Sequence, residues 1–426
     1  MKIERLYSVF RRYPVASTDS RTCPPGAVFF ALKGERFDGN DYIEQVLANG
    51  AAYAVGDSAS LPDSDRVIRV DNALQTLQNL AHYHRKQLPA VVIAVTGTNG
   101  KTTTKELIAA ALASQYPTLY TQGNLNNHIG VPLTLLQLRP EHRFAVIEMG
   151  ANHPGEIDAL CRIAEPDCGL ITNVGKAHLE GFGSLEGVIR AKTELYRFLR
   201  NAGGTVFVHS DNRILKDFCG FLPQTIDYGT APEAVVRGEI TATAPALALR
   251  WNGGTIATHL VGSYNFENVL AAVCVASYFG VEKEKINAAI ENYVPTNNRS
   301  QNVDTGRNRL IVDAYNANPS SMQAALENFN ALVLRPKMLI LGEMKELGDY
   351  SRAEHQKLID RISPAVDKVF LAGAGYAGCS SLPVGCRWFS TTDALADYLQ
   401  ANPPQGYLIL IKGSRSNRLE RVVEYL

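Results

Sequence analysis

A glycine-rich loop between two predicted elements carries the clearest chemistry in this sequence. Residues 95–104 read Val-Thr-Gly-Thr-Asn-Gly-Lys-Thr-Thr-Thr, after the apolar run 91–95 and before the helix-forming run 101–114. Glycines let backbone N–H groups converge on phosphate oxygens, and the start of a helix attracts negative charge. Lys101 is then placed to reach the terminal phosphates of a nucleotide, and the Thr102 hydroxyl to bind Mg²⁺. A turn without a ligand is the alternative, but a Lys-Thr pair at a helix start has little packing value, so the loop predicts a nucleotide site.

Three further residues are candidates for a metal site beside the loop. Glu148 follows the apolar run 144–147, and a carboxylate at the carboxyl end of a parallel strand faces the crevice of the sheet. His178 lies on a loop after another predicted strand, and Lys192 lies on a predicted helix. A neutral imidazole binds metals, whereas a lysine ammonium is repelled by them. The alternatives are a solvated strand-end carboxylate at Glu148 and an exposed helix lysine at Lys192.

The elements that must position these residues form three α/β units in the sequence. Short β-type runs and one helical run make up the first unit, residues 1–88. Residues 89–296 show the strand–loop–helix rhythm of a parallel sheet, with an antiparallel piece near 236–260 where Asn-Gly-Gly indicates a hairpin turn. A linker at 294–298 leads into a Rossmann-like unit, residues 297–426. The main predicted strands are 28–32, 52–55, 67–70, 91–95, 144–147, 170–172, 205–209, 310–312, 338–341, 369–372 and 408–411.

Composition argues against several classes of protein. Lysine and arginine total 42, as do aspartate and glutamate, so the formal net charge is zero and no general field attracts a nucleic acid. The charged N-terminus leaves no room for the apolar core of a signal peptide, and no stretch is long enough to span a membrane. The seven cysteines are scattered, which favours free thiols in a reducing compartment. We therefore expect a cytoplasmic protein that binds neither nucleic acid nor membrane.

Several stretches together resemble one known family. The loop sequence Thr-Asn-Gly-Lys-Thr-Thr, residues 98–103, resembles that of the Mur ligases and of their relatives the folylpolyglutamate synthases. The segment 262–268, Gly-Ser-Tyr-Asn-Phe-Glu-Asn, resembles a second signature of these ligases. Further stretches resemble the branch of the family that adds a dipeptide: 19–21, 31–39, 123–132, 148–153, 315–322, 341–348 and 412–415. The resemblance therefore covers nearly the whole chain and implies the three-domain Mur ligase architecture, with a central P-loop ATPase domain of parallel sheet.

This resemblance also implies a reaction. It is that of an ATP-dependent ligase that joins D-alanyl-D-alanine to UDP-N-acetylmuramoyl-tripeptide through an acyl phosphate, giving the pentapeptide used for peptidoglycan. Residues 1–88 would bind the UDP-sugar, 89–296 ATP, and 297–426 the incoming dipeptide. Two Mg²⁺ ions and a carbamylated Lys192 are implied as well, and carbamylation needs a neutral amine, hence a lysine pKa lowered by burial or by nearby positive charge. The usual state in the family is a monomer.

Roles for individual residues follow from the same resemblance. The catalytic residues would be Lys101, His178 and Lys192. The ATP-binding residues would be Gly97, Thr98, Asn99, Gly100, Lys101, Thr102, Thr103, Asn268, Arg299 and Asp313. The metal would be held by Thr102, Glu148, His178 and Lys192. The UDP-substrate would contact Ser20, Arg21, Lys33, Gly34, Asn126 and Asn127. The dipeptide would contact Asn316, Asn318 and Ser414.

Two alternative functions remain open on the sequence. Another Mur ligase or a folylpolyglutamate-type ligase would share the phosphate loop, but the segment 315–322 and the first unit count against it. A catalytically silent nucleotide-binding paralogue would share the fold, but the intact loop and metal-site residues count against it. At single positions, Asn265 is suited to capping a helix whether or not Asn268 contacts adenine, and Arg299 is equally suited to the surface of a linker.

Overall fold

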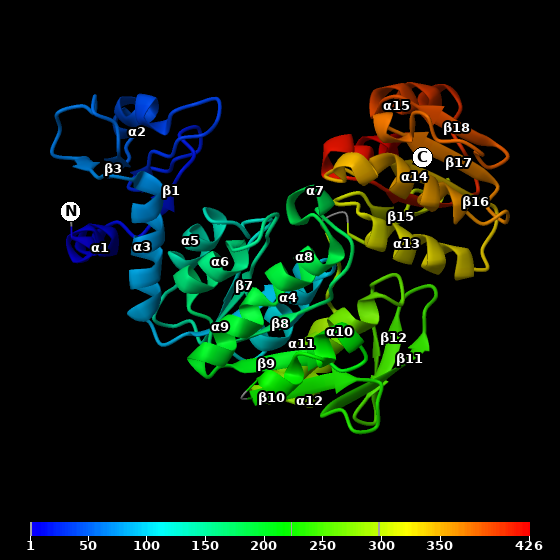
Figure 1. Ribbon diagram of the computed structural model, residues 1–426, viewed down its shortest axis with the longest axis horizontal. Helices are drawn as coiled ribbons and strands as arrows, with labels where there is room; N and C mark the ends of the chain where they lie inside the picture. Colours follow the sequence, from blue (N-terminus) through cyan, green and yellow to red (C-terminus); the bar gives the residue numbers. More distant parts are fainter. Residues whose placement is uncertain (1, 223, 297–298) are drawn as a thin grey trace.

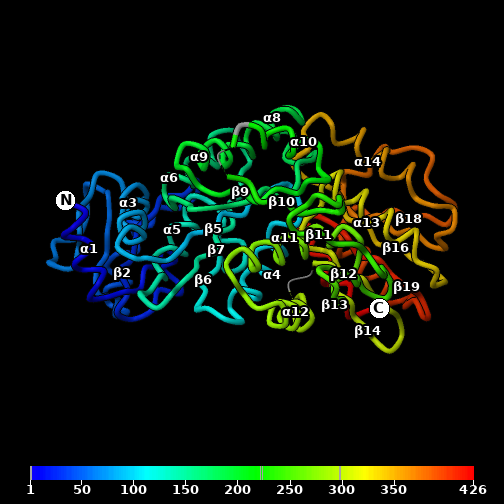
Figure 2. The backbone as a smooth tube through the Cα atoms, turned by 90° about the horizontal axis from the view of Figure 1, so that it is seen from below, coloured from blue at the N-terminus to red at the C-terminus, as the bar shows by residue number. Residues whose placement is uncertain are grey.

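Three β-sheets follow one another along the chain in the computed structural model, which describes residues 2–222, 224–296 and 299–426. Figure 1 shows the units built on them in a row, with the first (blue) at one end, the third (yellow to red) at the other and the largest between them. Figure 2 shows the same order from below. Within the described ranges, no helix is both long and apolar enough to cross a membrane.

The first sheet is small and parallel, and one long helix joins it to the centre of the molecule. Its elements are α1 (Ile3–Arg12), β1 (Ala16–Ser17), β2 (Val28–Phe30), η1 (Gly39–Tyr42), α2 (Ile43–Ala48), β3 (Tyr53–Gly56), β4 (Val67–Arg69) and α3 (Ala73–Lys86). The Asn72 side chain caps α3 by accepting a hydrogen bond from Gln75 N–H at 2.7 Å. Leu77 and Leu80 on α3 belong to a hydrophobic core that continues under the central sheet. One apolar core therefore ties the first unit to the second.

The central sheet has nine strands in the order β13-β12-β11-β10-β9-β8-β5-β7-β6. They are β5 (Val91–Thr96), β6 (Thr118–Tyr120), β7 (Phe144–Glu148), β8 (Cys168–Ile171), β9 (Thr205–His209), β10 (Gln224–Gly229), β11 (Val236–Ala242), β12 (Ala248–Trp251) and β13 (Gly254–Ala257). Neighbours from β6 to β11 pair in parallel, and β11, β12 and β13 pair antiparallel. At the predicted hairpin, Asn252 and Gly253 have φ values of 44° and 76°, as a type I′ turn requires.

Helices cover both faces of the parallel part, so its inner strands are buried on both sides. In β5, Val92 belongs to one core and the next residue, Ile93, to the other. The Ile93 face is covered by α4 (Lys101–Ala113), α11 (Asn265–Tyr278) and α12 (Lys283–Glu291). The other face is covered by α5 (Gly130–Leu135), α6 (Glu156–Ala164), α8 (Leu185–Lys192), α9 (Glu194–Ala202) and α10 (Arg213–Lys216). Val95 is in register with Glu148 on β7 and Leu170 on β8, so the loops after these strands meet at one edge.

The third sheet has six strands in the order β14-β15-β19-β16-β17-β18, all parallel except β14. Its strands are β14 (Gln301–Asp304), β15 (Arg309–Asp313), β16 (Lys337–Gly342), β17 (Lys368–Ala372), β18 (Cys386–Phe389) and β19 (Leu408–Lys412). The helices are α13 (Pro319–Ala331), α14 (Ser351–Asp360) and α15 (Thr392–Ala401). Asp313 and Lys412 end neighbouring strands and are register partners. Of the linker expected before this unit, Asn297 and Asn298 lie outside the described residues.

Candidate functional site

The glycine-rich loop connects β5 to α4 in a conformation that two glycines make possible. Gly97 has φ 144°, and a Cβ there would lie 2.0 Å from the Thr172 hydroxyl oxygen. Gly100 has φ 76°, and a Cβ there would lie 2.4 Å from the Asn268 side-chain oxygen. Both angles are in the region that residues with a Cβ rarely adopt. The loop is therefore closely fitted to the residues around it before any ligand binds.

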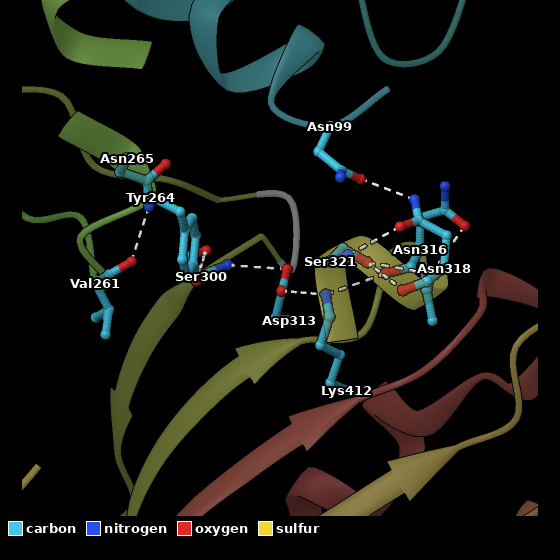
Figure 3. A network of polar contacts seen from close by, with 11 residues as sticks. Asn99, Val261, Tyr264, Asn265, Ser300, Asp313, Asn316, Asn318, Ser321 and Lys412 are labelled. Carbon is cyan, nitrogen blue, oxygen red and sulfur yellow. Dashed lines mark hydrogen bonds and ion pairs between the residues drawn. The ribbon is translucent and has the colours of Figure 1, made fainter. Parts of the chain in front are cut away.

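Asn99 in this loop is held by residues from two other parts of the chain. Its N–H donates to Asn173 Oδ1 at 2.9 Å, and its carbonyl accepts a hydrogen bond from the Thr172 hydroxyl at 2.6 Å. Its side-chain oxygen accepts a hydrogen bond from Asn318 Nδ2, in the third unit, at 2.8 Å (Figure 3). The loop is thus fixed by the end of β8 and by the unit that lies over it.

Lys101 begins α4, and its ammonium group turns back onto the loop. Its Nζ donates to the carbonyl oxygens of Gly97 at 2.8 Å and Thr98 at 3.1 Å. Burial lowers the pKa of Lys101, and the charge of Arg299 lowers it further, while the charge of Glu148 opposes this shift. Neutral carbonyls are weak partners for a desolvated cation, so a phosphate placed here would be a stronger acceptor.

A cavity of about 340 Å³ lies at this loop, with walls from the central and third units. Its size lies within the range of small-molecule sites. It brings together these predicted site residues: Thr98, Asn99, Gly100, Lys101, Thr102, Thr103, Asn126, Glu148, His178, Asn268, Arg299, Asp313 and Asn316. The predicted residues outside its lining are Gly97, Lys192, Ser20, Arg21, Lys33, Gly34, Asn127, Asn318 and Ser414.

Glu148 is the last residue of β7 and only 1% exposed. Its Oε1 accepts a hydrogen bond from Asn126 Nδ2 at 2.7 Å, whereas its buried Oε2 has no hydrogen-bond partner among the residues that the structure describes. A buried carboxylate oxygen without a partner is costly unless a cation lies against it. In the described chain no group of three His, Cys, Asp or Glu side chains could hold a metal ion. The oxygens of Glu148 and Thr102 nevertheless match the hard ligands that Mg²⁺ takes together with water and phosphate.

His178 lies where the central and third units meet. It precedes the short helix α7 (Leu179–Phe182) with a left-handed φ of 49° and lines the cavity. Its Nδ1 lies against a carboxylate oxygen of Glu346 in the third unit, which makes an ion pair when the ring is protonated. The hydrogen bond from His178, followed by its charge, lowers the pKa of the Glu346 carboxyl despite partial burial. His178 therefore joins the units as well as facing the cavity.

Lys192 ends α8 just behind the cavity wall and is 2% exposed. Its Nζ donates to the Ala151 carbonyl at 3.4 Å and lies 5.5 Å from the centre of the Phe182 ring. Burial, followed by the positive charge of Lys101, lowers its pKa to about 7, although Glu156 and Glu194 act in the opposite direction. Lys192 is buried, so it is not the exposed helix lysine of the alternative interpretation.

The signature at 262–268 forms the start of α11 and a wall of the cavity. Asn268, 3% exposed, accepts a hydrogen bond from the Thr104 hydroxyl at 3.0 Å and donates to Asn265 Oδ1 at 2.9 Å. Asn265 in turn donates to the Val261 carbonyl at 2.8 Å, as Figure 3 shows. These bonds fix the orientation of both amides. The expected capping role of Asn265 is wrong: Asn265 is the first residue of α11, which has no side-chain cap, and its amide donates to the Val261 carbonyl instead of accepting a helix N–H.

The third unit supplies a charged wall opposite the loop. Lys412, 3% exposed, forms an ion pair with Asp313 and donates to the Asn316 carbonyl at 3.3 Å (Figure 3). The Arg299 guanidinium lies 3.8 Å from the centre of the Tyr315 ring, which also lines the cavity. No sequence motif predicted that Lys412, Tyr315 or Asn173 would line a nucleotide site. For Lys412 and Asn173, the available signal was their position at the carboxyl ends of apolar strands.

The UDP-substrate candidates lie in two places. The Arg21 guanidinium makes two hydrogen bonds to Asp19, at 2.9 and 2.7 Å, and with the bond from the Arg21 backbone N–H they lower the pKa of that carboxyl to about 2. The Lys33 Nζ lies 3.2 Å from Asp57 Oδ1. Ser20 is adjacent to Arg21 in one loop of the first unit, and Gly34 is adjacent to Lys33 in another. Asn126 instead binds Glu148 in the cavity, and Asn127 caps the start of α5 by accepting the N–H of Gly130 at 2.9 Å.

The three dipeptide candidates have different surroundings. Asn316 lines the cavity. Asn318 caps α13 by accepting the N–H of Ser321 at 2.9 Å, besides its bond to Asn99. Ser414 is 4% exposed, and its hydroxyl accepts the N–H of Lys345 at 3.1 Å. Asn318 and Ser414 thus have structural partners already.

Known proteins match this chain along nearly its whole length. Residues 14–85 match the Mur ligase family catalytic domain, 95–276 the Mur ligase middle domain, and 298–415 the Mur ligase glutamate ligase domain. The UDP-N-acetylmuramoyl-tripeptide–D-alanyl-D-alanine ligase of Bacillus subtilis (strain 168) is 36% identical, covering 96% of this chain and 92% of that protein. The chain belongs to the Mur ligase family.

Solved structures agree with this assignment. A crystal structure of MurF from Acinetobacter baumannii has a TM-score of 0.86 and 33% identity, covering 96% of this chain and 92% of that one. The MurF ligase from Thermotoga maritima in complex with ADP has a TM-score of 0.84 and 27% identity, covering 96% of both chains. The predicted fold class, three Mur ligase units with a central parallel sheet, is therefore confirmed.

Proposed function

We propose that this chain is an ATP-dependent ligase that joins D-alanyl-D-alanine to UDP-N-acetylmuramoyl-tripeptide, giving UDP-N-acetylmuramoyl-pentapeptide for peptidoglycan synthesis. The observation that carries the proposal is one cavity in which Lys101 of a phosphate loop and the buried carboxylate of Glu148 share a wall, opposite residues of the third unit. Relatives that cover almost the whole chain are named for this activity, and one solved relative binds ADP.

The proposed chemistry has two steps. A carboxylate oxygen of the tripeptide attacks the γ-phosphorus of ATP, the bond to the bridging oxygen breaks, and an acyl phosphate and ADP result. The dipeptide amine then attacks the carbonyl carbon, phosphate leaves and the nitrogen loses a proton. Both reactants of the first step are anions, so the site must concentrate positive charge. Lys101 and Arg299 line the cavity and supply it.

The third unit has two parts in this proposal. Asp313 and Asn268 would hold the ribose and adenine of ATP, since both line the cavity. The contacts Asn318–Asn99 and Glu346–His178 hold the third unit against the loop. An acyl phosphate is destroyed by water, so a unit that covers the phosphates protects the intermediate. The incoming dipeptide would bind to the same unit, beside Asn316.

Magnesium belongs to the proposal, and the residues present fit it. Glu148 offers a buried oxygen that has no hydrogen-bond partner, and Thr102 offers a hydroxyl in the cavity lining. Together with His178 and Lys192 they would hold two ions. When bound, the metal supplies positive charge to the phosphate oxygens.

Lys192 would act as a metal ligand only after carbamylation, which we also propose. The neutral amine adds to the carbon of CO₂ and loses a proton, so a cation becomes an oxygen-donating anion. Its burial and its pKa of about 7 support the availability of the neutral amine. Intact mass of protein kept in bicarbonate and Mg²⁺ should show an added CO₂ that Lys192→Arg lacks. An unchanged mass would contradict this part.

The test of the whole function is phosphate release from ATP and Mg²⁺ with the UDP-tripeptide, D-alanyl-D-alanine, both or neither. Release that needs both, with a UDP-pentapeptide detected by mass, is expected. Background release with intact ATP binding would instead identify a silent paralogue, and turnover with another acceptor from a panel would identify a different ligase. We place the reaction in a cytoplasmic monomer; the free state of all seven cysteines supports a reducing compartment.

A further inference from the structure

A row of polar contacts leads from the phosphate loop to a buried histidine that no motif singled out. Asn173 accepts the N–H of Asn99 at 2.9 Å and donates to the Asn99 carbonyl at 3.3 Å. The same amide donates to Glu267 Oε1, on α11, at 2.9 Å. Glu267 Oε2 lies 3.3 Å from His209 Nδ1, at the end of β9. The loop is therefore connected to α11 and β9 through Asn173.

His209 is firmly placed at the outer end of this row. It is 8% exposed, and its ring stacks on Tyr228 with centroids 5.4 Å apart and planes 14° apart. Its Nε2 lies 3.5 Å from Asp211 Oδ2, so the ring stands between two carboxylates. Glu267 lines the nucleotide cavity and also, with His209, a second cavity beside it. Neither ring nitrogen makes a hydrogen bond within the described part of the chain, so a protonated ring would support Glu267 through the ion pair, without touching a substrate.

The chemistry of the Asn173 amide explains what Glu267 does. An amide has a donor side and an acceptor side, whereas an ionised carboxylate only accepts. With its NH₂ toward Glu267, Asn173 must present its oxygen to the N–H of Asn99. The reversed amide would set oxygen against oxygen at Glu267 and donor against donor at Asn99. Glu267 therefore determines which side of Asn173 meets the loop.

We propose that Glu267, supported by His209, is a positioning residue that orients Asn173 and thereby sets the phosphate loop at Asn99. Asn99 also accepts the bond from Asn318, so the same contacts set the loop for the third unit. For turnover the inference rests on the proposed ligase function, but for nucleotide binding it does not.

The test compares Glu267→Ala, Glu267→Gln and His209→Gln with a matched control. Glu239 lines the same second cavity, but it pairs with Arg250 at 3.1 Å at the surface, so Glu239→Ala removes a carboxylate outside the row. In Glu267→Ala, ADP affinity by calorimetry should fall about tenfold and the KM for ATP should rise equally, because a hydrogen bond to a charged group is lost. The KM for the UDP-tripeptide should stay within about twofold.

Recovery of ADP affinity in Glu267→Gln distinguishes a positioning role of Glu267 from a general loss of folding. Glu267→Gln keeps an oxygen that can accept from Asn173, so it should regain most of the ADP affinity, and His209→Gln should lose only about two- to threefold. Glu239→Ala should bind ADP like the wild type. Unchanged ADP affinity in a folded Glu267→Ala would overturn the inference, as would equal loss in Glu267→Gln. Calorimetry needs no turnover, so an inactive wild type that still binds ADP would refute the ligase function and leave this test intact.

Discussion

The phosphate loop and the loops of the first unit are both proposed to bind nucleotides, yet they are built differently. Asn99 and Lys101 are held by bonds to the loop itself, to Asn173 just after β8 and to the third unit. Arg21, with 84% of its side chain exposed, is held by Asp19 only two residues away. A site that aligns reacting atoms must be formed in advance, whereas a site that only recognises a substrate can be completed by it. Substitutions in the phosphate loop should therefore have large effects on turnover. Substitutions in the loops of the first unit should have small effects on substrate binding.

The largest effect is expected at Lys101. Lys101→Ala removes the cation that faces the transferring phosphate, so kcat should fall about 1,000-fold or more. Thermal unfolding should change little, because the ammonium bonds only to carbonyls of its own loop. Steady-state phosphate release measures the first quantity and a thermal melt the second. Retained turnover would refute the assignment of the loop.

Lys192 should come next. Lys192→Ala removes the proposed oxygen-donating anion, and kcat should fall about 100-fold, the scale seen when a group around a metal site is lost. Formate or acetate can then enter the vacated space as a carboxylate and restore part of the activity. The variant is assayed with and without these anions. Full activity of Lys192→Ala without them would show that the lysine takes no part.

Two glycines give a matched pair across the two regions. Gly100→Ala places a methyl group 2.4 Å from Asn268 Oδ1 at a φ of 76°, so ATP affinity should fall about 30-fold. Gly34→Ala meets only the ring of Phe37, which is 58% exposed and can turn away, so both KM values should stay within about twofold. Similar losses in both variants would remove the proposed contrast between a rigid and an adaptable site.

The pH dependence of turnover tests the role of Lys192. The amine is protonated below its pKa of about 7 and cannot take up CO₂, so wild-type turnover should fall about fivefold between pH 7 and pH 6. Lys192→Ala rescued by formate has no such amine and should not show this fall. Rates in bicarbonate-containing buffers across that range make the comparison. Parallel profiles would assign the titration to another group.

The smallest effect is expected in the first unit. Arg21→Ala should raise the KM for the UDP-tripeptide about threefold and leave the KM for ATP unchanged, because an exposed charge contributes little. Separate titrations of the two substrates measure this. A change in the ATP constant instead would show that the first unit is coupled to the phosphate loop more tightly than its exposed contacts suggest.

Much of the fold could be predicted, for a physical reason. Inner strands such as β5 and β9 are buried along nearly their whole length because helices cover both faces, and the apolar runs within them are visible in the sequence. β14, Gln-Asn-Val-Asp, and the half-buried β6 were not predicted. β14 is largely polar and β6 has only three residues, so neither shows a recognisable strand pattern, and each pairs with a neighbouring strand through backbone hydrogen bonds.

The residues of the candidate site also fall into those that the sequence predicts and those that it does not. Lys101 and Glu148 follow a loop and a strand whose surroundings can be inferred from adjacent residues. The role of Lys412 depends on its contact with Asp313, 99 residues earlier in the chain. The role of Asn173 depends in the same way on its contact with Glu267. Such pairs form only when separate strands reach the same edge, so single motifs do not reveal them.

The single bond from Asn126 to Glu148 has a consequence for ion selectivity. It engages one lone pair of Oε1, whereas Oε2 has no hydrogen-bond partner among the described residues, so an ion binds most readily at Oε2. Calcium favours bidentate carboxylates and six to eight oxygens, whereas magnesium accepts one oxygen and keeps its waters. By favouring monodentate binding through Oε2, Asn126 would disfavour the larger ion.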